Sequence, residues 1–481
     1  MTRNSAGSGA ASKPAKACEG GRSSERNTPL CVDLDGTLVK TDMLLESLLA
    51  LVKSRPSCFF LLPFWLLKGK AHLKMQVAQR VTLDVSCLPY NTSLLALLAE
   101  QHQAGRPLIL IAASDRSIAR PIAEHLGLFS DVLASDGKIN LCGGEKLKVL
   151  QEKFAGRDFA YAGNAEVDLT IWAHAGRAQN NRFEALLRAM RLHQWAKNAL
   201  VFVPLLLAHK VSNFTLLLDA VGAFVAFGLC ASSAYLLNDL VDLEADRGHP
   251  SKKSRPFAAG DLSLGLGMAT IPALLAATVV VAGFLPLRFL MVLGLYYLLT
   301  LAYSFRLKRV LLMDVIVLAS LYTIRIFAGA QATGVVLSPW LLNFSLFLFL
   351  SLALMKRFSE LRQVALENRQ SVKGRNYLTE DCPHLVSMGA ASGYIAVLVL
   401  GLYISSHEVA VLYASRQLLW LVCPAMLYWI NRAWLIAHRG QMNEDPVLFA
   451  LRDLRSYWVG MAVGAVMLLA KYGPPSFVSG F

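Results

Sequence analysis

Three aspartates follow an apolar run that is long enough to cross a bilayer, and their spacing indicates a site for a divalent cation. The run extends from Phe214 to Leu237, and the acids are Asp239, Asp242 and Asp246. Spacings of three and four residues place side chains on one face of a helix, so we expect the three carboxylates to stack there. Such a stack repels itself unless a cation lies on it, and Mg²⁺ prefers oxygen ligands that it shares with substrate phosphates.

Basic residues follow the aspartates at once and supply a second kind of phosphate contact. Guanidinium and ammonium groups bind phosphate oxygens through charge-assisted hydrogen bonds. The segment carries Arg247, His249, Lys252, Lys253 and Arg255. We therefore predict a Mg²⁺-diphosphate site at a membrane surface. The alternative is a charged helix cap followed by a positive-inside loop, although a plain loop needs no regular spacing of acids.

The segment from Asn238 to Gly260 resembles the first aspartate motif of the UbiA superfamily of intramembrane prenyltransferases. Its NDxxDxxxD pattern is followed by DRxHPxKxxRPxAxG, which is most similar to the bacterial polyprenyl-phosphate phosphoribosyltransferases. The resemblance implies an all-α membrane bundle that uses Mg²⁺, a diphosphate-containing donor and a polyprenyl lipid substrate. It also implies that the three aspartates are catalytic metal ligands and that substrate contacts come from Asn238, Arg247, His249, Lys252 and Arg255.

Apolar segments and their flanking charges predict the topology of residues 187–474. The segments are roughly 195–209, 213–237, 268–285, 287–304, 311–333, 338–356, 386–405, 411–431 and 456–470. Basic clusters precede the first segment and follow the second, fourth, sixth and eighth, so the positive-inside rule makes these loops cytoplasmic. We predict an integral protein of the bacterial inner membrane with about nine transmembrane helices and a cytoplasmic N-terminal domain.

The composition agrees with a membrane protein for part of the chain only. Of the 481 residues, 55% are hydrophobic and 17% are charged, which leaves room for a soluble domain beside the bundle. The net charge of +14 does not indicate nucleic-acid binding, because the basic residues lie mainly in loops between apolar runs. This distribution suits the anionic face of a lipid bilayer and anionic substrates. The eight cysteines form no CxxC pair, which favours free thiols.

A second motif follows the fourth apolar segment. Tyr303, Ser304, Leu307, Lys308 and Asp314 resemble the second conserved site of the superfamily, where a full DxxxD is frequent. The single acid here departs from aromatic prenyltransferases and agrees with the phosphoribosyl branch. The resemblance implies that Tyr303 and Lys308 bind substrate, and that Asp314 binds metal or orients a sugar in a pocket shared with the first motif. A juxtamembrane lysine and an N-capping aspartate are the alternative.

Two further basic residues lie within apolar segments. Arg325 is eleven residues beyond Asp314, about 16 Å deeper along a helix. A buried arginine in a membrane segment is costly and usually functional, so we predict an anion contact in the pocket or an ion pair within it. Lys197, in the sequence RLHQWAKN, resembles a motif of the family's first helix and is predicted to line the same cavity.

Residues 29–176 alternate strand-like and helix-like pieces, which indicates an α/β domain with a Rossmann-like parallel sheet. Strands are expected at 30–32, 107–112 and 159–162, with a helical cap at about 42–91. Residues 1–28 are predicted to be a disordered tail without the apolar region of a secretory signal. The apolar run Cys58–Leu67 is too short to cross a bilayer and is either a core helix or a segment at the membrane interface.

The sequence DLDGTL after the first strand resembles motif I of the haloacid-dehalogenase superfamily. The resemblance implies that Asp33 is a nucleophile that forms an aspartyl-phosphate with the help of Mg²⁺, and that Asp35 is the acid/base. Lys146 fits the third motif as a phosphate contact. Asn164 and Asp168 fit the fourth and would complete the metal site with the two aspartates.

Two departures from this family pattern bear on activity. Asn164 stands where the family usually has aspartate and removes one negative charge from the metal site. Ser114 comes slightly late after its strand for the second motif. An active phosphatase and a degenerate domain that serves regulation or membrane docking both remain open. An active domain beside a phosphoribosyltransferase would be suited to remove the 5-phosphate of a lipid-linked ribose.

Three classes of function compete for the whole chain. The first is transfer of a phosphoribosyl group from phosphoribosyl diphosphate to a polyprenyl phosphate. The second is an aromatic prenyltransferase that uses a polyprenyl diphosphate, as in quinone or pigment synthesis. The third is a transporter, whose substrate charges would lie near the membrane midplane, whereas these acids lie at helix ends. The sequence indicates no particular oligomeric state.

Overall fold

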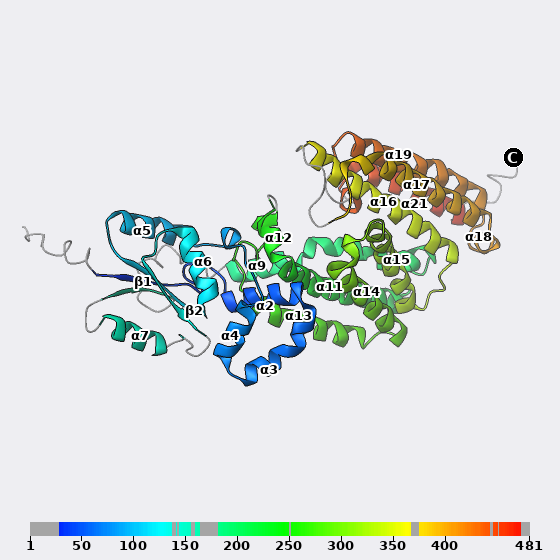
Figure 1. Ribbon diagram of the computed structural model, residues 1–481. Helices are drawn as coiled ribbons and strands as arrows, with labels where there is room; N and C mark the ends of the chain where they lie inside the picture. Colours follow the sequence, from blue (N-terminus) through cyan, green and yellow to red (C-terminus); the bar gives the residue numbers. More distant parts are fainter. Residues whose placement is uncertain are drawn as a thin grey trace, which may run out of the picture. The chain divides into compact units, whose positions relative to one another are not determined.

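The computed structural model of the protein describes residues 28–136, 141, 144–154, 159–163, 181–249, 252–366, 375–442, 446–450 and 452–472. The chain forms two units (Figure 1). Unit 1 comprises Met1–Leu186 and Asp239–Leu266, and unit 2 comprises Leu187–Asn238 and Gly267–Phe481. We call Asp239–Leu266 the aspartate segment. Apart from Thr28, the predicted tail lies outside the described residues.

A parallel sheet of four strands is the centre of unit 1, in the order β3-β2-β1-β4. The strands are β1 (Leu30–Asp33), β2 (Leu108–Asp115), β3 (Asp131–Ser135) and β4 (Ala160–Ala162). All residues of β1 are buried, as expected for a parallel strand that is covered on both faces. The predicted parallel α/β domain is thus confirmed, and β3 is an additional strand that the sequence analysis missed.

Helices cover both faces of this sheet. Val32 enters one core with residues of α5 (Thr92–Gln103) and α6 (Arg116–Leu126). Its neighbour Cys31 enters a second core with Leu150 of α7 (Gly144–Phe154). This alternation follows from the two-residue period of a strand. It leaves the carboxyl ends of β1 and β2 as the edge from which polar side chains can extend.

The region between β1 and α5 is helical, as predicted for the cap. It contains α2 (Met43–Ser54), the 3₁₀ helix Pro56–Leu61, α3 (Leu62–Leu67) and α4 (Lys70–Ala78). Asp42 caps α2, because its Oδ1 accepts the backbone N–H groups of Leu44 and Leu45. In the apolar run, Cys58 and Trp65 face a small core, whereas other large side chains of the run are exposed.

Seven helical stretches in the described part of the chain are long and apolar enough to cross a membrane. They are α11 (Phe214–Val241), α13 (Leu264–Ala282), α14 (Leu287–Phe305), α15 (Met313–Thr333), α16 (Pro339–Leu366), Thr379–Ser405 with α17 (Cys382–Ser405), and Arg416–His438 with α19 (Val422–His438). Shorter elements are α9 (Asn181–Met190), α12 (Leu243–Arg247), α18 (His407–Leu412), α20 (Pro446–Ala450) and the 3₁₀ helices Val85–Cys87, Lys252–Ser254 and Leu307–Arg309.

The predicted count of nine spans is not confirmed. The first predicted segment, 195–209, forms the 3₁₀ helix Leu192–Phe202 and the short helix α10 (Val203–Leu207), with Pro204 in its first turn. Each is shorter than the roughly 20 residues that a spanning helix needs. The last predicted segment lies in α21 (Leu454–Tyr472), which is not among the seven.

Small residues allow close packing in unit 2. A Cβ atom at Gly329 of α15 would lie 2.0 Å from the carbonyl oxygen of Val201, so only glycine fits this contact. The contact brings the 3₁₀ helix Leu192–Phe202 against α15. Lys197 and Asn198 therefore approach the membrane helix that carries Arg325.

Candidate functional site

The aspartates of the first motif are divided between two helices. Helix α11 ends at Val241, and Asp242 occupies the N-cap position of α12. The prediction of one continuous helical face is therefore wrong, since the spacing argument assumed an unbroken helix. In the described part of the chain, no group of three or more His, Cys, Asp or Glu side chains converges to hold a metal ion.

Arg255 connects the two outer aspartates. Asp239 and Asp246 are 2% and 4% exposed, and both accept hydrogen bonds from Nη1 of Arg255, at 3.1 and 2.5 Å. Burial raises the pKa of Asp246, the charge of Arg255 opposes this rise, and the charge of Asp239 adds to it. A single cationic nitrogen thus lies between two buried carboxylates. The donor set suits a Mg²⁺ ion at the same place, because Mg²⁺ takes one or two carboxylates together with phosphate oxygens.

Other predicted phosphate ligands of this segment differ in their surroundings. Arg247 donates to both carboxylate oxygens of Glu46, at 2.9 and 2.6 Å, and to the carbonyl oxygen of Ala258 at 3.3 Å. It is therefore held in an ion pair within unit 1. His249 is exposed and Lys252 is half-buried, so both can be reached by a ligand from solvent. The sequence offered no signal for Glu46, which lies in the predicted cap.

Asp314 of the second motif lies in a closed network. It is 0% exposed and accepts hydrogen bonds from Nε of Arg357 and, at 2.5 Å, from the Tyr377 hydroxyl. Arg357 also donates to the Tyr303 hydroxyl at 3.1 Å and to Glu360 at 2.5 Å. Both oxygens of Asp314 are thus occupied by side chains of unit 2. This arrangement favours a structural ion pair over the predicted role in binding metal or orienting a sugar. Lys308, six residues earlier in the sequence, is half-buried.

The side chains of Arg325 and Lys197 lie near the same aromatic ring, that of Tyr322, in unit 2. Arg325 is 5% exposed and donates to Asn198 Oδ1 and to the Tyr296 hydroxyl, both at 2.9 Å, and to the carbonyl oxygen of Leu321. Its guanidinium carbon lies 5.5 Å from the ring centre of Tyr322, and Lys197 Nζ lies 5.8 Å from the same ring.

The cluster around these two cations includes a hydrogen-bond donor that has no partner. Asn198 is 1% exposed, and its Nδ2 has no hydrogen-bond partner. Arg325 is nearly buried, and its guanidinium donates to neutral groups of the described residues, namely Asn198, Tyr296 and Leu321. Such a site is costly unless an anion binds there. The geometry therefore favours the predicted anion contact over the predicted ion pair.

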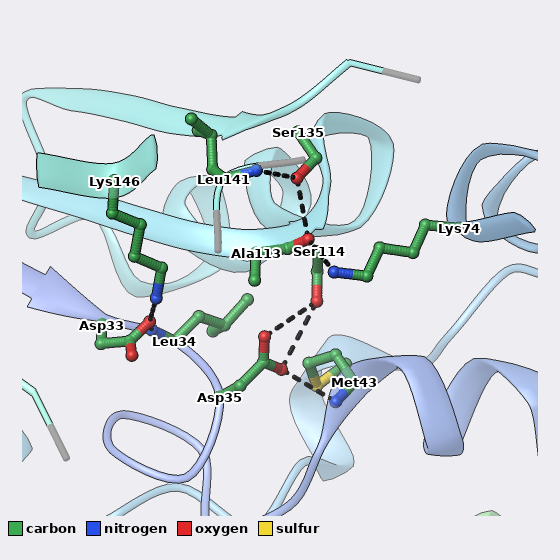
Figure 2. Close-up of polar contacts among 10 residues, drawn as sticks. All are labelled: Asp33, Leu34, Asp35, Met43, Lys74, Ala113, Ser114, Ser135, Leu141 and Lys146. Carbon is green, nitrogen blue, oxygen red and sulfur yellow. Dashed lines mark hydrogen bonds and ion pairs between the residues drawn. The ribbon is translucent and has the colours of Figure 1, made fainter. Parts of the chain in front are cut away.

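The predicted haloacid-dehalogenase motifs also come together, at the carboxyl ends of β1 and β2 (Figure 2). Lys146 Nζ lies 2.6 Å from Asp33 Oδ1, which also accepts the N–H of Leu34 at 2.9 Å. Ser114 donates to Asp35 Oδ2 at 3.1 Å. Carboxylate oxygens of this kind suit Mg²⁺. The other predicted ligands, Asn164 and Asp168, lie outside the described residues.

Ser114 reaches the site because β2 is longer and less regular than predicted. The strand continues to Asp115, and its pairing with β3 shifts register between Ala112 and Asp115. The irregularity turns the Ser114 side chain toward Asp35, as Figure 2 shows. Although Ser114 comes late after the predicted strand, its hydroxyl group thus lies within hydrogen-bond distance of Asp35. A small cavity beside it is lined by Leu44, Ser47, Lys74, Ser114, Asp115 and Ile118.

Both the membrane part and the α/β domain match known protein families. Residues 199–460, more than half of the chain, match the UbiA prenyltransferase family. The chain belongs to the UbiA prenyltransferase family. Residues 30–172 match the haloacid dehalogenase-like hydrolases. The protein is therefore a membrane-integral UbiA transferase with a haloacid-dehalogenase-like domain at its N-terminal side.

The relatives of this UbiA protein differ in how much of its length they match. An uncharacterized protein of Sinorhizobium fredii, y4nM, is 37% identical over 93% of this chain and 92% of its own length. The decaprenyl-phosphate phosphoribosyltransferase of Corynebacterium glutamicum is 34% identical over 47% of this chain and 70% of its own. A UbiA homologue from Archaeoglobus fulgidus, solved with DMAPP and Mg²⁺, is 16% identical, with a TM-score of 0.44 over 59% of this chain and 97% of its own.

Replacing Asp314 with asparagine is expected to lower the free energy of unfolding of this UbiA protein by about 3 kcal/mol, because it leaves the buried charge of Arg357 without a full partner. Thermal unfolding in detergent measures the effect, with Glu380→Gln at an exposed position as control. The double variant Asp314→Asn/Arg357→Gln should recover part of the loss. Unchanged stability combined with lost transfer would instead support the metal-ligand role.

Asp35 is expected to make the α/β domain less stable as pH rises. Burial raises the pKa of Asp35, while hydrogen bonds from the Met43 N–H and Ser114 oppose the rise. The folded state then holds the proton more tightly than the unfolded state, whose pKa is about 3.9. Stability is therefore greatest below that value and falls as pH rises through the raised pKa.

The variant Asp35→Asn should remove this loss. At pH 7 it should slow the thiol labelling of Cys31, a buried β1 residue that reacts only when the sheet opens. The difference in labelling rate between the variant and the wild type should become smaller toward pH 5. Asp84→Asn, which alters an exposed carboxylate, is the control. Faster labelling of Asp35→Asn at pH 7 would contradict the expected direction.

Proposed function

We propose that this UbiA protein transfers a phosphoribosyl group from phosphoribosyl diphosphate to a polyprenyl phosphate in a Mg²⁺-dependent reaction. The observation that carries the proposal is the cluster of Lys197, Asn198 and Arg325, because a buried guanidinium held by neutral groups and an unpaired amide donor favour an anionic acceptor. The HPxK extension of the first motif and the similarity to a decaprenyl-phosphate phosphoribosyltransferase support the same branch.

The aspartate segment would hold the donor. Asp239 and Asp246 would bind Mg²⁺ in the place of the Arg255 guanidinium, which then turns to oxygens of the diphosphate. Bound Mg²⁺ supplies neutralisation of the diphosphate as it leaves. His249 and Lys252, exposed and half-buried, would contact the remaining donor oxygens. The bond between ribose C1 and the diphosphate breaks, and the diphosphate keeps the electron pair.

The acceptor would come from the lipid. Lys197 and Arg325 would bind the phosphate of a polyprenyl phosphate, and Asn198 Nδ2 would donate to one of its oxygens. An acceptor oxygen then forms the new bond to ribose C1. The apolar surroundings keep water from intercepting the cationic sugar. Basic clusters around both motifs lead us to place the N-terminal domain on the cytoplasmic side of a bacterial inner membrane.

We also propose that the α/β domain is a phosphatase that removes the 5-phosphate from the lipid-linked product. The convergence of Asp33, Asp35, Ser114 and Lys146 supports this activity (Figure 2). Asp33 would attack phosphorus while Lys146 balances the phosphate charge. Asp35 would protonate the departing ribose oxygen, and water would then hydrolyse the aspartyl-phosphate. The raised pKa of Asp35 suits a group that must carry a proton.

The transfer proposal is tested with membranes from cells that overproduce the protein. They receive labelled phosphoribosyl diphosphate, polyprenyl phosphate and Mg²⁺, and membranes without the protein are the control. Label that moves into the organic phase supports the proposal. Transfer from a labelled polyprenyl diphosphate to an aromatic acid, without phosphoribosyl transfer, would establish the aromatic alternative and overturn it.

A further inference from the structure

Glu46, in the first turn of α2, is bound to the aspartate segment by a buried ion pair. The Glu46 and Arg247 side chains are 4% and 6% exposed. The carboxylate accepts two hydrogen bonds from Arg247, at 2.6 and 2.9 Å, and one from Thr41 Oγ1 at 2.6 Å. Glu46 and Arg247 are 201 positions apart, so their contact joins the cap to a motif of the transferase. Arg247 is a predicted substrate contact, whereas Glu46 belongs to neither predicted set of site residues.

The same surface of unit 1 receives the far end of the segment. Gly260 has a φ of +75°, and a Cβ there would lie 2.9 Å from Cβ of Lys40 and 3.4 Å from Cβ of Pro89. A Cβ at Gly265 would lie 3.8 Å from Leu45. The backbone therefore comes close to the residues just before and within α2. Two places in the segment, Arg247 and Gly260, are thus held against one short stretch of the α/β domain.

The ion pair also connects the two halves of the segment. Nε of Arg247 donates to the carbonyl oxygen of Ala258, three residues after Arg255. Arg255 is the side chain that bridges Asp239 and Asp246. Glu46 therefore fixes Arg247, and Arg247 fixes the backbone beside the cation that contacts both aspartates.

We propose that Glu46 is a positioning residue for the aspartate segment, so that a helix of the phosphatase-like domain holds part of the transferase site. This inference rests on the proposed transfer function. One turn earlier, the Met43 N–H of the same helix donates to Asp35 at 2.9 Å. Helix α2 thus contacts both candidate sites within one turn, which gives the fusion of the two domains a structural reason beyond proximity.

A gain in the stability of the folded protein does not by itself explain why a buried ion pair is present at this place. Removing two charges from water is costly, and an apolar pair of similar volume is often equally stable. A bidentate Arg–carboxylate contact fixes the relative orientation of its two side chains, whereas an apolar pair does not. A positioning role therefore predicts that an apolar pair keeps the fold but not the geometry of the site.

The test uses the full chain and three variants: Glu46→Gln, Glu46→Asp and the apolar pair Glu46→Met/Arg247→Met. Hydrogen exchange of peptides from residues 252–266, transfer kcat and KM, and thermal unfolding are measured for each. We expect Glu46→Gln to speed exchange in these peptides and to lower kcat about tenfold or more, with Glu46→Asp recovering part of the activity. The apolar pair should unfold near the wild-type temperature yet transfer poorly. Glu124→Gln, in an exposed pair with Arg120, is the matched control.

Two outcomes would overturn the inference. One is full transfer activity in the apolar pair, and the other is unchanged exchange over residues 252–266 in Glu46→Gln. Failure of the proposed function is a separate result, since it means that the wild type itself moves no phosphoribosyl label. The exchange measurement does not depend on the reaction, so it tests Glu46 in either case.

An exposed apolar face of the cap carries a second, independent inference. Phe60, Phe64 and Leu67 are 74%, 64% and 85% exposed on the 3₁₀ helix Pro56–Leu61 and α3, whose place Figure 1 shows. Phe59, Leu61 and Leu66 are exposed as well. Basic residues lie on both sides of this run in the sequence: Lys53, Arg55, Lys68 and Lys70. Soluble proteins rarely present such a cluster to water without a partner.

We infer that this face inserts into the interface of an anionic lipid bilayer. Aromatic and leucine side chains between lysines and arginines suit that region, since apolar groups enter the acyl boundary and cations meet lipid phosphates. The run is too short to span the bilayer. Because the cap and the membrane helices belong to one chain, weak binding of this face to lipid suffices.

Photocrosslinking in nanodiscs tests this surface with the full chain. Benzoylphenylalanine replaces Phe60, or Leu97 of α5 as an exposed control in the same unit. The discs contain phosphatidylethanolamine with or without phosphatidylglycerol. We expect lipid adducts from position 60, more with phosphatidylglycerol, and few from position 97. Adducts of position 60 with peptides of this chain or of a second copy, or equal lipid adducts from both positions, would overturn the inference.

Discussion

Replacing Asp239 with asparagine is expected to lower phosphoribosyl transfer by about 10³-fold, the largest change in the membrane part. The carboxylate is buried and shares the Arg255 guanidinium with Asp246, so it lies where a cation is held. Asparagine keeps the shape but removes one of two negative charges. Loss of a preorganised electrostatic contact to a developing charge typically costs about 10²–10³ in rate, and a lost metal ligand adds to that cost. The labelled transfer assay measures the change directly.

Two comparisons separate loss of the cation site from general damage. Asp219→Asn changes an acid on the same helix, α11, twenty residues earlier, and should transfer like the wild type. Chelation of Mg²⁺ should bring the wild type down to the level of Asp239→Asn and leave the variant little changed. A variant that kept more than a tenth of wild-type transfer would exclude Asp239 as an essential ligand.

The first motif shows what spacing can and cannot predict. Acids at positions 239, 242 and 246 follow an apolar run, from which the sequence predicted a charged site, and Asp239 and Asp246 are buried there. Spacing assumes a continuous helix, however, and the break at Asp242 depends on tertiary packing. The capture of Arg247 by Glu46 could not be predicted either, since nothing local in the sequence relates two residues 201 positions apart.

The arginines of unit 2 show the same limit. Arg325 was recognised because a charge inside an apolar run is rare, and its burial agrees with that reasoning. Arg357 follows the sixth predicted segment directly, in a basic cluster that was assigned to a cytoplasmic loop, yet it is 1% exposed and bound to Asp314. The position of a charge relative to the end of an apolar run is therefore a poor guide to its burial.

In the α/β domain, buried strands were easier to predict than exposed ones. The fully buried β1 and most of β2 are nearly continuous apolar runs, as parallel strands require. Strand β3 has only one fully buried residue and the mixed sequence DVLAS, so its pattern is weak. The register shift in β2 that directs Ser114 to Asp35 leaves no mark in hydrophobic periodicity.

The variant Asp33→Asn is expected to accumulate a lipid product that still carries its 5-phosphate. Asp33 Oδ1 is held 2.6 Å from Lys146, and the side chain lies at the end of β1 where a phosphate group can meet it (Figure 2). An amide cannot form the acyl-phosphate, so dephosphorylation should fall by about 10³-fold or more. Mass spectrometry of the extracted lipid measures the ratio of phosphorylated to dephosphorylated product.

Transfer itself should not change in this variant, because label should still enter the organic phase at the wild-type rate. Asp131→Asn alters a partly exposed carboxylate of the same domain, paired with Lys153, and should behave like the wild type in both steps. An unchanged product ratio in Asp33→Asn would reject the phosphatase. The domain would then serve through its contacts with the aspartate segment, and Glu46→Gln would still impair transfer. Sensitivity to Asp33 and to Glu46 together would mean that one domain both positions the transferase segment and processes its product.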